Sequence, residues 1–207
     1  FRIKDRVGGT KNLRHKHIDQ IMPDLIIANK EENTKEDIES LRERYPVWTS
    51  DVKKLEDALE MIKALGRLTD RQSRGDALAA SIRETFDQLP VPETRERVLY
   101  LIWKSPYMAA GRDTFINDML ERAGFENALT DPESRYPELS EADIATLRPE
   151  RILLSSEPFP FKGRHSKEMR KRFPSIPLQE VDGELFSWYG SRLLKSPNYF
   201  REIRHMG

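Results

Sequence analysis

Two short apolar runs, far apart in the chain, repeat one another in their hydrophobic pattern. The first is PDLIIANKEEN at 23–33, and the second is PERILLSSE at 149–157. Each run follows a segment whose apolar residues keep helical spacing. Because proline stops a helix and a short apolar run suits a parallel strand covered on both faces, each copy predicts a helix, a corner and a buried strand. The positions that match at a constant offset are Ile18, Ile21, Pro23, Asp24, Ile26 and Ile27 in the first copy, and Ile144, Leu147, Pro149, Glu150, Ile152 and Leu153 in the second.

The pattern continues beyond the two strands in the same order. TKEDIESLRERYP, with Thr34 as its cap, predicts a short amphipathic helix, and HSKEMRKRFP predicts its counterpart after a slightly longer loop. Each copy then has another strand that ends in aspartate, at Asp51 and at Asp182. Strand–helix–strand units imply right-handed parallel connections, so the chain is predicted to hold two parallel-sheet bodies.

A long helical stripe separates the two copies. Leu78, Ile82, Phe86 and Leu89 fall on one face of a helix predicted from about Thr69 to Leu89, roughly 30 Å long. Pro90 and Pro92 end it. This helix is either a stiff connector between two lobes or an ordinary crossover helix inside one sheet, and the sequence does not decide between them.

The second body is predicted to open with the strand RVLYLIW at 97–103 and the helix DTFINDMLERAG, capped by Asp113 and stopped by Gly124. The predicted fold class is therefore α/β, with two Rossmann-like parallel-sheet lobes joined by one long α-helix. The expected domains are an N-terminal lobe at 1–67, a connecting helix at 68–89 and a C-terminal lobe at 90–207.

Composition narrows the classes of function. Lys plus Arg equals Asp plus Glu at 35 each, so the balance gives no indication of a nucleic-acid partner. No apolar run approaches the ~18 residues that span a bilayer. The chain has no cysteine, which excludes disulfides, thiolate metal sites and iron–sulfur clusters. It begins at Phe1 rather than Met, so we expect a removed leader or a fragment of a longer chain.

Ligands of open parallel sheets bind beyond the carboxyl ends of the strands, and the predicted strand ends here are rich in aromatic residues. In SWYGSR two large aromatic residues adjoin, and one of Trp188 and Tyr189 must point away from the core if the segment is helical. The alternative is that each aromatic residue caps the core. The residues predicted to bind ligand are Asn29, Lys30, Trp103, Tyr107, Met108, Phe161, Phe186, Trp188, Tyr189 and Arg192.

No pattern of catalytic residues is visible. His15 and His17 lack the spacing that puts two metal ligands on one helical face, and no G-x-S-x-G elbow is present. We therefore expect no metal site, no catalytic residue and no intrinsic cofactor.

With these segments identified, the chain resembles the helical-backbone metal-receptor family, the class III periplasmic binding proteins that carry cobalamin or ferric siderophores to ABC importers. The resemblance covers most of the chain in order. It is carried by VGGTKN (7–12), PDLIIANKEEN (23–33), VWTSDVKKLEDAL (47–59), LIWKSPYMAAGRDTFINDMLERAGFENAL (101–129), YPELSEADIATLRPERILLSSEPFPF (136–161) and FSWYGSRLL (186–194).

The resemblance implies a metal chelate held between two lobes, with Trp103, Tyr107, Trp188 and Arg192 at the contacts. Cobalamin is the preferred ligand, and an anionic ferric siderophore, served by Arg192 with Lys104 or Arg112, is the alternative. It also implies a periplasmic or envelope-associated protein that docks on an importer permease through surface acids. The candidates are Glu31, Glu32 and Glu36 on the first lobe and Glu157 and Glu168 on the second.

One departure from the family pattern concerns the first lobe. Family members have a further strand–helix–strand before VGGTKN, so the first lobe is expected to be incomplete. An unpaired sheet edge can be covered by another chain, and a homodimer through this lobe is a further expectation. Two other functions stay open: an enzyme, such as a transferase, that uses the interlobe cleft, and a remnant of the family that no longer binds ligand.

Overall fold

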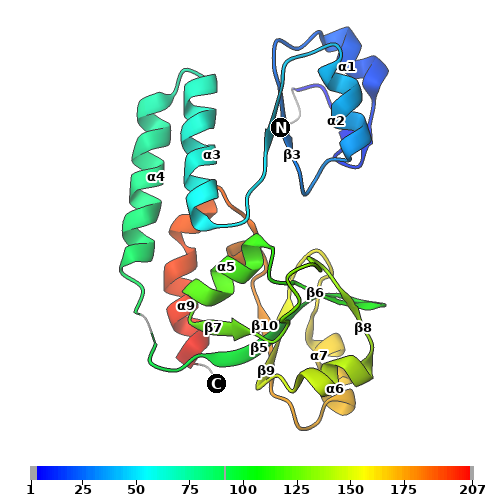
Figure 1. Cartoon of the computed structure of the whole chain (residues 1–207), viewed down its shortest axis with the longest axis vertical. Coiled ribbons are helices and arrows are strands. Elements are labelled where there is room, and N and C mark those ends of the chain that lie inside the picture. Colours follow the sequence, from blue (N-terminus) through cyan, green and yellow to red (C-terminus); the bar gives the residue numbers. More distant parts are fainter. Residues whose placement is uncertain (1–3, 91, 206–207) are drawn as a thin grey trace. The chain divides into compact units, whose positions relative to one another are not determined.

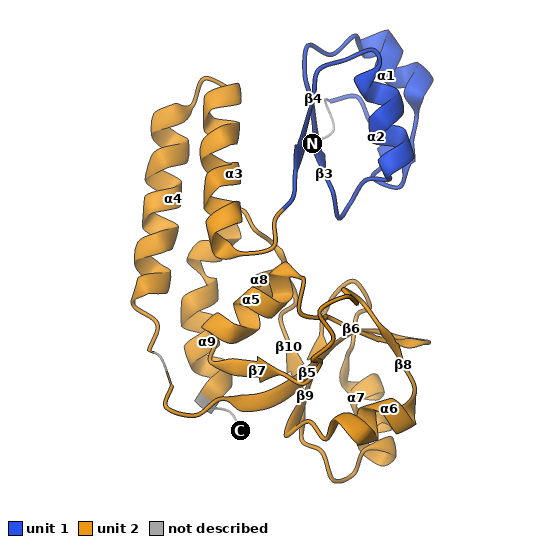
Figure 2. Ribbon diagram, in the orientation of Figure 1, with its two compact units in different colours: residues 1–51 blue, residues 52–207 orange. Residues whose placement is uncertain are grey.

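The computed structural model describes residues 4–90 and 92–205 of the chain. These residues form two compact units, 1–51 and 52–207, each described here by itself (Figure 2). Residues 52–67, expected in the first lobe, make their contacts within the second unit. The expected domain boundaries at 67 and 89 stay a prediction.

The first unit is a small strand–helix–strand body preceded by a short hairpin. Its core is formed by Ile18, Ala28, Ile38 and Leu41. Strands β3 and β4 pair in parallel, as the repeat predicts. Thr34 caps α2 by accepting a hydrogen bond from the backbone N–H of Asp37. The elements are β1 (Gly8–Gly9), β2 (Asn12–Leu13), α1 (His15–Ile21), β3 (Ile26–Asn29), α2 (Lys35–Arg42) and β4 (Val47–Ser50).

The second unit is built on a mixed sheet of order β10-β9-β5-β6-β8, with β7 pairing beside β5 (Figure 1). The pairs β10–β9, β9–β5 and β5–β7 are parallel, whereas β6 is antiparallel to both of its neighbours. The strands are β5 (Glu96–Lys104), β6 (Tyr107–Ala109), β7 (Phe125–Asn127), β8 (Glu138–Leu139), β9 (Arg151–Ser155) and β10 (Leu178–Val181). The helices are α3 (Leu55–Leu68), α4 (Gln72–Asp87), α5 (Phe115–Arg122), α6 (Glu141–Leu147), α7 (Gly163–Arg172), α8 (Glu184–Ser187), η1 (Ser191–Leu194) and α9 (Ser196–His205).

Successive side chains along β5 point to opposite faces of the sheet and belong to two separate hydrophobic clusters. Val98 and Tyr100 belong to the cluster that includes residues of α3, α4, α5 and α9, while Leu99 and Leu101 belong to the cluster that includes residues of α6 and α7. This is the period-two pattern of a strand buried on both faces. Figure 1 shows α6 and α7 on one side of the sheet and α5 and α9 on the other.

The structure confirms the internal repeat, and the two copies agree even in the backbone conformation of single residues. Met22 and Arg148 occupy equivalent places after α1 and α6, and both adopt the left-handed conformation, with φ of 48° and 46°. The strand register is also shared, since Ile26 pairs with Val47 as Ile152 pairs with Leu178. The connection after β9 is two residues longer than the connection after β3, as predicted.

The predicted long helix is present as α4, slightly shorter than expected, and it packs along α3 (Figure 1). Two glycines allow the close approach. A Cβ atom on Gly66 would lie 3.2 Å from the Cα atom of Gly75, and one on Gly75 would lie 3.0 Å from the carbonyl oxygen of Ile62. Among the described residues, no helix is both long and apolar enough to cross a bilayer.

The cap predicted for α5 was wrong. Thr114, not Asp113, is the N-cap, and its hydroxyl accepts a hydrogen bond from the backbone N–H of Asn117. Asp113 instead forms an ion pair with Lys53 at 2.8 Å. The stop is confirmed, because Gly124 takes a positive φ of 84° that favours glycine.

Candidate functional site

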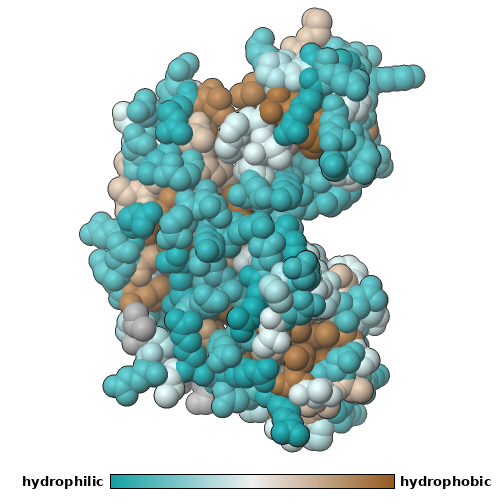
Figure 3. All heavy atoms as spheres, in the orientation of Figure 1, coloured by the Kyte–Doolittle hydropathy of each residue, from teal (hydrophilic) through white to brown (hydrophobic). Residues whose placement is uncertain are grey.

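The carboxyl ends of β5, β9 and β10 lie together at one edge of the second unit's sheet, because these strands are parallel neighbours. The loop 156–162 follows β9, and residues 182–190 follow β10. The face drawn in Figure 3 is largely hydrophilic. Two tryptophans at this edge are exposed.

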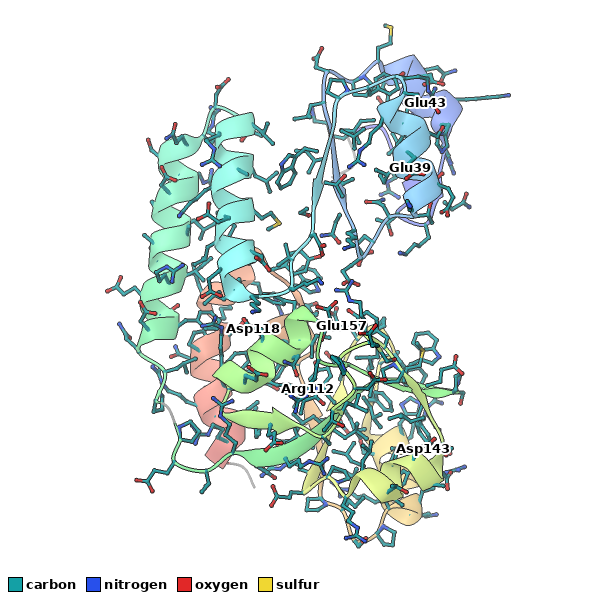
Figure 4. The ribbon with its side chains drawn as sticks, viewed as in Figure 1. Glu39, Glu43, Arg112, Asp118, Asp143 and Glu157 are labelled. Atoms are coloured by element: carbon teal, nitrogen blue, oxygen red, sulfur yellow. The ribbon has the colours of Figure 1, made fainter. Side chains whose placement is uncertain are left out.

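The first of these is Trp188, whose side chain is 51% exposed. It follows the end of α8 in extended conformation. Its indole Nε1–H donates a hydrogen bond to Oε1 of Glu157 at 2.9 Å, and the hydroxyl of Ser187 donates to the same oxygen. Glu157 belongs to the loop after β9, labelled in Figure 4, so this carboxylate joins the two loops.

A buried network holds Glu157 from beneath. The phenol of Tyr100 donates to Oγ of Ser155 at 3.2 Å, and that hydroxyl donates to the carbonyl oxygen of Glu157 at 2.6 Å. Burial raises the pKa of the Tyr100 phenol, so it remains a donor. Gly183 packs closely over this loop, since a Cβ atom there would lie 2.3 Å from the Oγ atom of Ser155 and 2.7 Å from the Cγ atom of Glu157.

The second exposed tryptophan, Trp103, lies at the end of β5 and is 39% exposed. Its ring packs edge-on against Phe159, with centroids 5.6 Å apart. Phe159 in turn contacts Phe161 and His165. The loop 156–162 therefore contacts both tryptophans, Trp103 through Phe159 and Trp188 through Glu157.

The charges around Trp188 are mainly negative. The guanidinium of Arg192 lies over the Trp188 ring, 5.7 Å from its centroid. The same guanidinium forms ion pairs with Glu184 and, at 3.6 Å, with Asp182. With Glu157 nearby, acids outnumber the one arginine in this cluster.

The other two cations predicted to serve an anionic ligand are also engaged. Lys104 forms an ion pair with Glu168, and its side chain is largely buried. The Nε–H of Arg112 donates to the carbonyl oxygen of Leu129 at 2.9 Å. Lys104 is therefore already paired, whereas Arg112 is exposed and uses its Nε–H for this hydrogen bond.

Several predicted ligand residues have packing roles in the structure. Tyr107, Phe161 and Phe186 are buried, and Phe186 lies wholly within the core against Tyr100. Met108 and Tyr189 are half-buried, and the Tyr189 ring packs against Phe115 at 5.3 Å. The helix expected through SWYGSR ends at Ser187, and Trp188 points outward from an extended backbone rather than from a helix.

Asn29 and Lys30 lie in the first unit, at the end of β3. The side-chain oxygen of Asn29 accepts hydrogen bonds from the backbone N–H groups of Glu31 and Glu32 at 3.0 and 3.2 Å. Lys30 forms an exposed ion pair with Asp51 at 2.5 Å. Asn29 therefore shapes the turn that carries two of the predicted docking acids.

The acids predicted for docking differ in whether they are bonded to other side chains of the protein. Glu36 is exposed in the first turn of α2, and Glu32 accepts a hydrogen bond from Thr10 at 3.2 Å. Glu168 is held by Lys104 and Arg172, and the hydrogen bond from Lys104 is the main reason its carboxyl pKa lies below the ordinary value. Glu157 is engaged with Trp188.

The histidines considered as metal ligands have protein partners. His15 contacts Asp37 at 2.7 Å, and His17 contacts Gln20 at 3.2 Å. Across the part of the chain that the structure describes, no group of three or more metal-ligating side chains comes together.

Comparison with known proteins identifies the family. A family model described as periplasmic binding protein matches residues 6–178. The chain therefore belongs to the periplasmic binding protein family, and the predicted resemblance and fold class are confirmed. The proteins of this family are binding proteins rather than enzymes.

Individual relatives share modest identity with the chain. The vitamin B12-binding protein of Vibrio parahaemolyticus is 25% identical over 155 residues, which are 73% of this chain and 56% of that relative's length. The vitamin B12-binding protein of Vibrio campbellii is 21% identical, over 96% of this chain and 74% of its own length.

Solved structures support the fold. The periplasmic heme-binding protein BhuT, in complex with two hemes, has a TM-score of 0.79 at 20% identity, over 99% of this chain and 83% of its own. The vitamin B12-binding protein BtuF of Vibrio cholerae has a TM-score of 0.73 at 17% identity, over 97% and 82%. At these identities the likeness shows the fold alone.

Sequence reasoning missed the residues that orient Trp188. Nothing in the sequence links Glu157 to a tryptophan so much further along the chain. The ion pairs of Arg192 could have been predicted, because two acids, Asp182 and Glu184, precede it in the same short segment.

Proposed function

We propose that this chain is the substrate-binding component of an ABC importer and captures a corrinoid of the cobalamin type. The observation that carries the proposal is the exposed and braced Trp188 at the carboxyl edge of the second unit's sheet, the edge at which Trp103 is also exposed. This edge forms one wall of the ligand site.

The two rings suit a large ligand with an apolar ring system. Aromatic side chains bury more surface than other residues and bind planar groups through stacking and area burial. The Vibrio relatives are named for binding vitamin B12, which agrees with this class of ligand.

Charge favours a corrinoid over an anionic ferric siderophore. Cyanocobalamin carries no net charge, whereas ferric catecholates and citrates are anions. An anion at this wall would meet Glu157, Asp182 and Glu184, and the guanidinium of Arg192 is already paired with two of these acids. Desolvating an anion beside this cluster of acids is unfavourable.

The importer partner and the location follow from the family. The function as a substrate-binding subunit implies the periplasm or the cell envelope, and a permease as partner. Glu32 and Glu36, which are exposed, are the best-placed docking acids of the first unit. Glu31 and Glu168 are further candidates, and a dimer through the first lobe stays a prediction.

Equilibrium dialysis of the purified chain against a panel of chelates tests the proposal. The panel is cyanocobalamin, a neutral ferric hydroxamate, an anionic ferric catecholate and hemin. We expect saturable binding of cyanocobalamin and much weaker binding of the two anions. Preferred binding of the ferric hydroxamate, the catecholate or hemin would overturn the corrinoid assignment, and binding of none would overturn the function.

A further inference from the structure

The carboxylate of Glu157 receives two hydrogen bonds from the segment that carries Trp188, and this has a consequence for ligand binding. We infer that Glu157 is a positioning residue of the ligand site, which fixes the Trp188 indole in its outward orientation. The inference rests on the proposed function for its effect on affinity, but the orientation of Trp188 is a property of the protein without ligand.

The geometry leaves Glu157 little freedom. Its backbone N–H donates to Oγ of Ser155 at 3.3 Å, and its carbonyl oxygen accepts from the same hydroxyl at 2.6 Å. Ser155 is buried, at the end of β9, and the buried Tyr100 donates to it. These hydrogen bonds anchor the backbone of the loop at Glu157 to the end of β9.

The carboxylate then braces the indole from one edge. Ser187 and Trp188 both donate to Oε1 of Glu157. On one face the ring lies near the guanidinium of Arg192, which Glu184 and Asp182 hold in place. A half-exposed tryptophan without such contacts samples several rotamers, and ordering it on binding costs free energy. Fixing the ring beforehand removes that cost.

The same hydrogen bonds also bear on the prediction that Glu157 docks on the importer permease. A carboxylate that docks on a permease arginine must present its oxygens outward, whereas Oε1 of Glu157 is occupied within the protein. The repeat relates Glu157 to Glu31 in sequence, but the side chain of Glu157 serves the ligand site.

The experiment compares Glu157→Ala, which removes the acceptor, with Glu157→Gln, which keeps an acceptor oxygen but removes the charge. Glu126→Ala, at an exposed position on β7, is the matched control. Acrylamide quenching of the ligand-free protein is measured in a Trp48→Phe, Trp103→Phe background, where Trp188 is the sole tryptophan. Cyanocobalamin affinity is measured in the parent background without a permease.

We expect Glu157→Ala to raise the quenching constant of Trp188 and to weaken cyanocobalamin binding about tenfold, or ~1.4 kcal/mol. Glu157→Gln should stay close to the parent protein in both measurements, and so should Glu126→Ala. Unchanged quenching in Glu157→Ala would overturn the positioning role, and so would a Glu157→Gln protein that binds as weakly as Glu157→Ala. If no variant and no parent binds cyanocobalamin, the proposed function fails, while the quenching result still decides whether Glu157 positions Trp188.

Discussion

Trp188 donates its indole N–H to Glu157 over 2.9 Å, and this contact ties the loop after β10 to the loop after β9. The loop after β9 belongs to the second copy of the internal repeat, and the loop after β10 follows that copy. In the first copy Asn29 stands at the place of Ser155, and its side chain likewise accepts from the backbone N–H two residues later. The repeat therefore conserves the turn, and in the second copy the turn carries the carboxylate that holds the exposed ring.

The first prediction concerns Trp188 itself. Trp188→Ala should weaken cyanocobalamin binding about 10- to 100-fold, because a large apolar contact is lost at the centre of the site. Calorimetric titration measures the change. Leu68→Ala, which removes an exposed apolar side chain at the end of α3, should leave the affinity unchanged. An unchanged affinity in Trp188→Ala would remove this residue from the site.

The second prediction concerns the charge that selects the ligand. Glu184→Gln removes one of the two acids that hold Arg192. The freed guanidinium should improve binding of an anionic ferric catecholate several-fold, with little effect on the neutral cyanocobalamin. Dialysis of both ligands at low and high salt measures the two affinities. The improved affinity for the catecholate should shrink at high salt, because salt screens its attraction to Arg192. Equal changes for both ligands would show that the cluster does not discriminate by charge.

The third prediction concerns the close packing at Gly183. Gly183→Ala should destabilise the second unit by about 1–3 kcal/mol, because the new methyl group would collide with Ser155 and Glu157. The backbone there is right-handed helical, so the cost comes from the collision rather than from the dihedral angles. Gly190→Ala is the control, since a Cβ atom there meets nothing within 4 Å. Urea unfolding measures both, and equal stabilities would contradict the predicted collision.

Much of the fold could be predicted from local patterns. The strands predicted at 26–29 and 151–155 are both present, beside proline corners and short helices. The expectation that both are buried was wrong for the first, because Ile27 is 50% exposed, whereas 151–155 are buried throughout. The helix α3 was not predicted, although Leu55, Leu59 and Ile62 keep helical spacing along it. Asp113 was a poorer choice than Thr114 because two adjacent residues can both cap, and tertiary contact with Lys53 decides between them.

The site was less predictable than the fold. Aromatic residues at strand ends were found, but sequence cannot separate Phe186, which fills the core, from Trp188, which faces outward. Their difference arises because the chain leaves helical geometry at Trp188. The pairing of Glu157 with Trp188 depends on how two loops meet in space, which no local pattern encodes.

The fourth prediction concerns acid stability of the first unit. Arg44 and Tyr45 both donate to the carboxylate of Asp19, and the hydrogen bond from Arg44 is the main reason the pKa of Asp19 lies below its ordinary value of about 3.9. A lowered folded pKa stabilises the unit above the unfolded value, and this stabilisation is lost as the pH falls through the folded pKa. Asp19→Asn should therefore be less stable than the parent near neutral pH.

The difference between the two proteins should shrink as the pH falls below about 4. Trp48 lies on β4, so its emission in a Trp103→Phe, Trp188→Phe background reports unfolding of this unit. Thermal melts across the acidic range measure the difference. A gap that stays constant down to strong acid would show that the Asp19 contacts do not contribute through its charge.

The most direct test of the central claim is a titration of the Trp48→Phe, Trp103→Phe protein with cyanocobalamin, following the emission of Trp188 alone. Free tryptophan amide at the same absorbance corrects for the light that the corrinoid absorbs. We expect saturable one-to-one quenching, since the ligand covers the exposed indole. Saturable binding seen by dialysis with no change in Trp188 emission would contradict it.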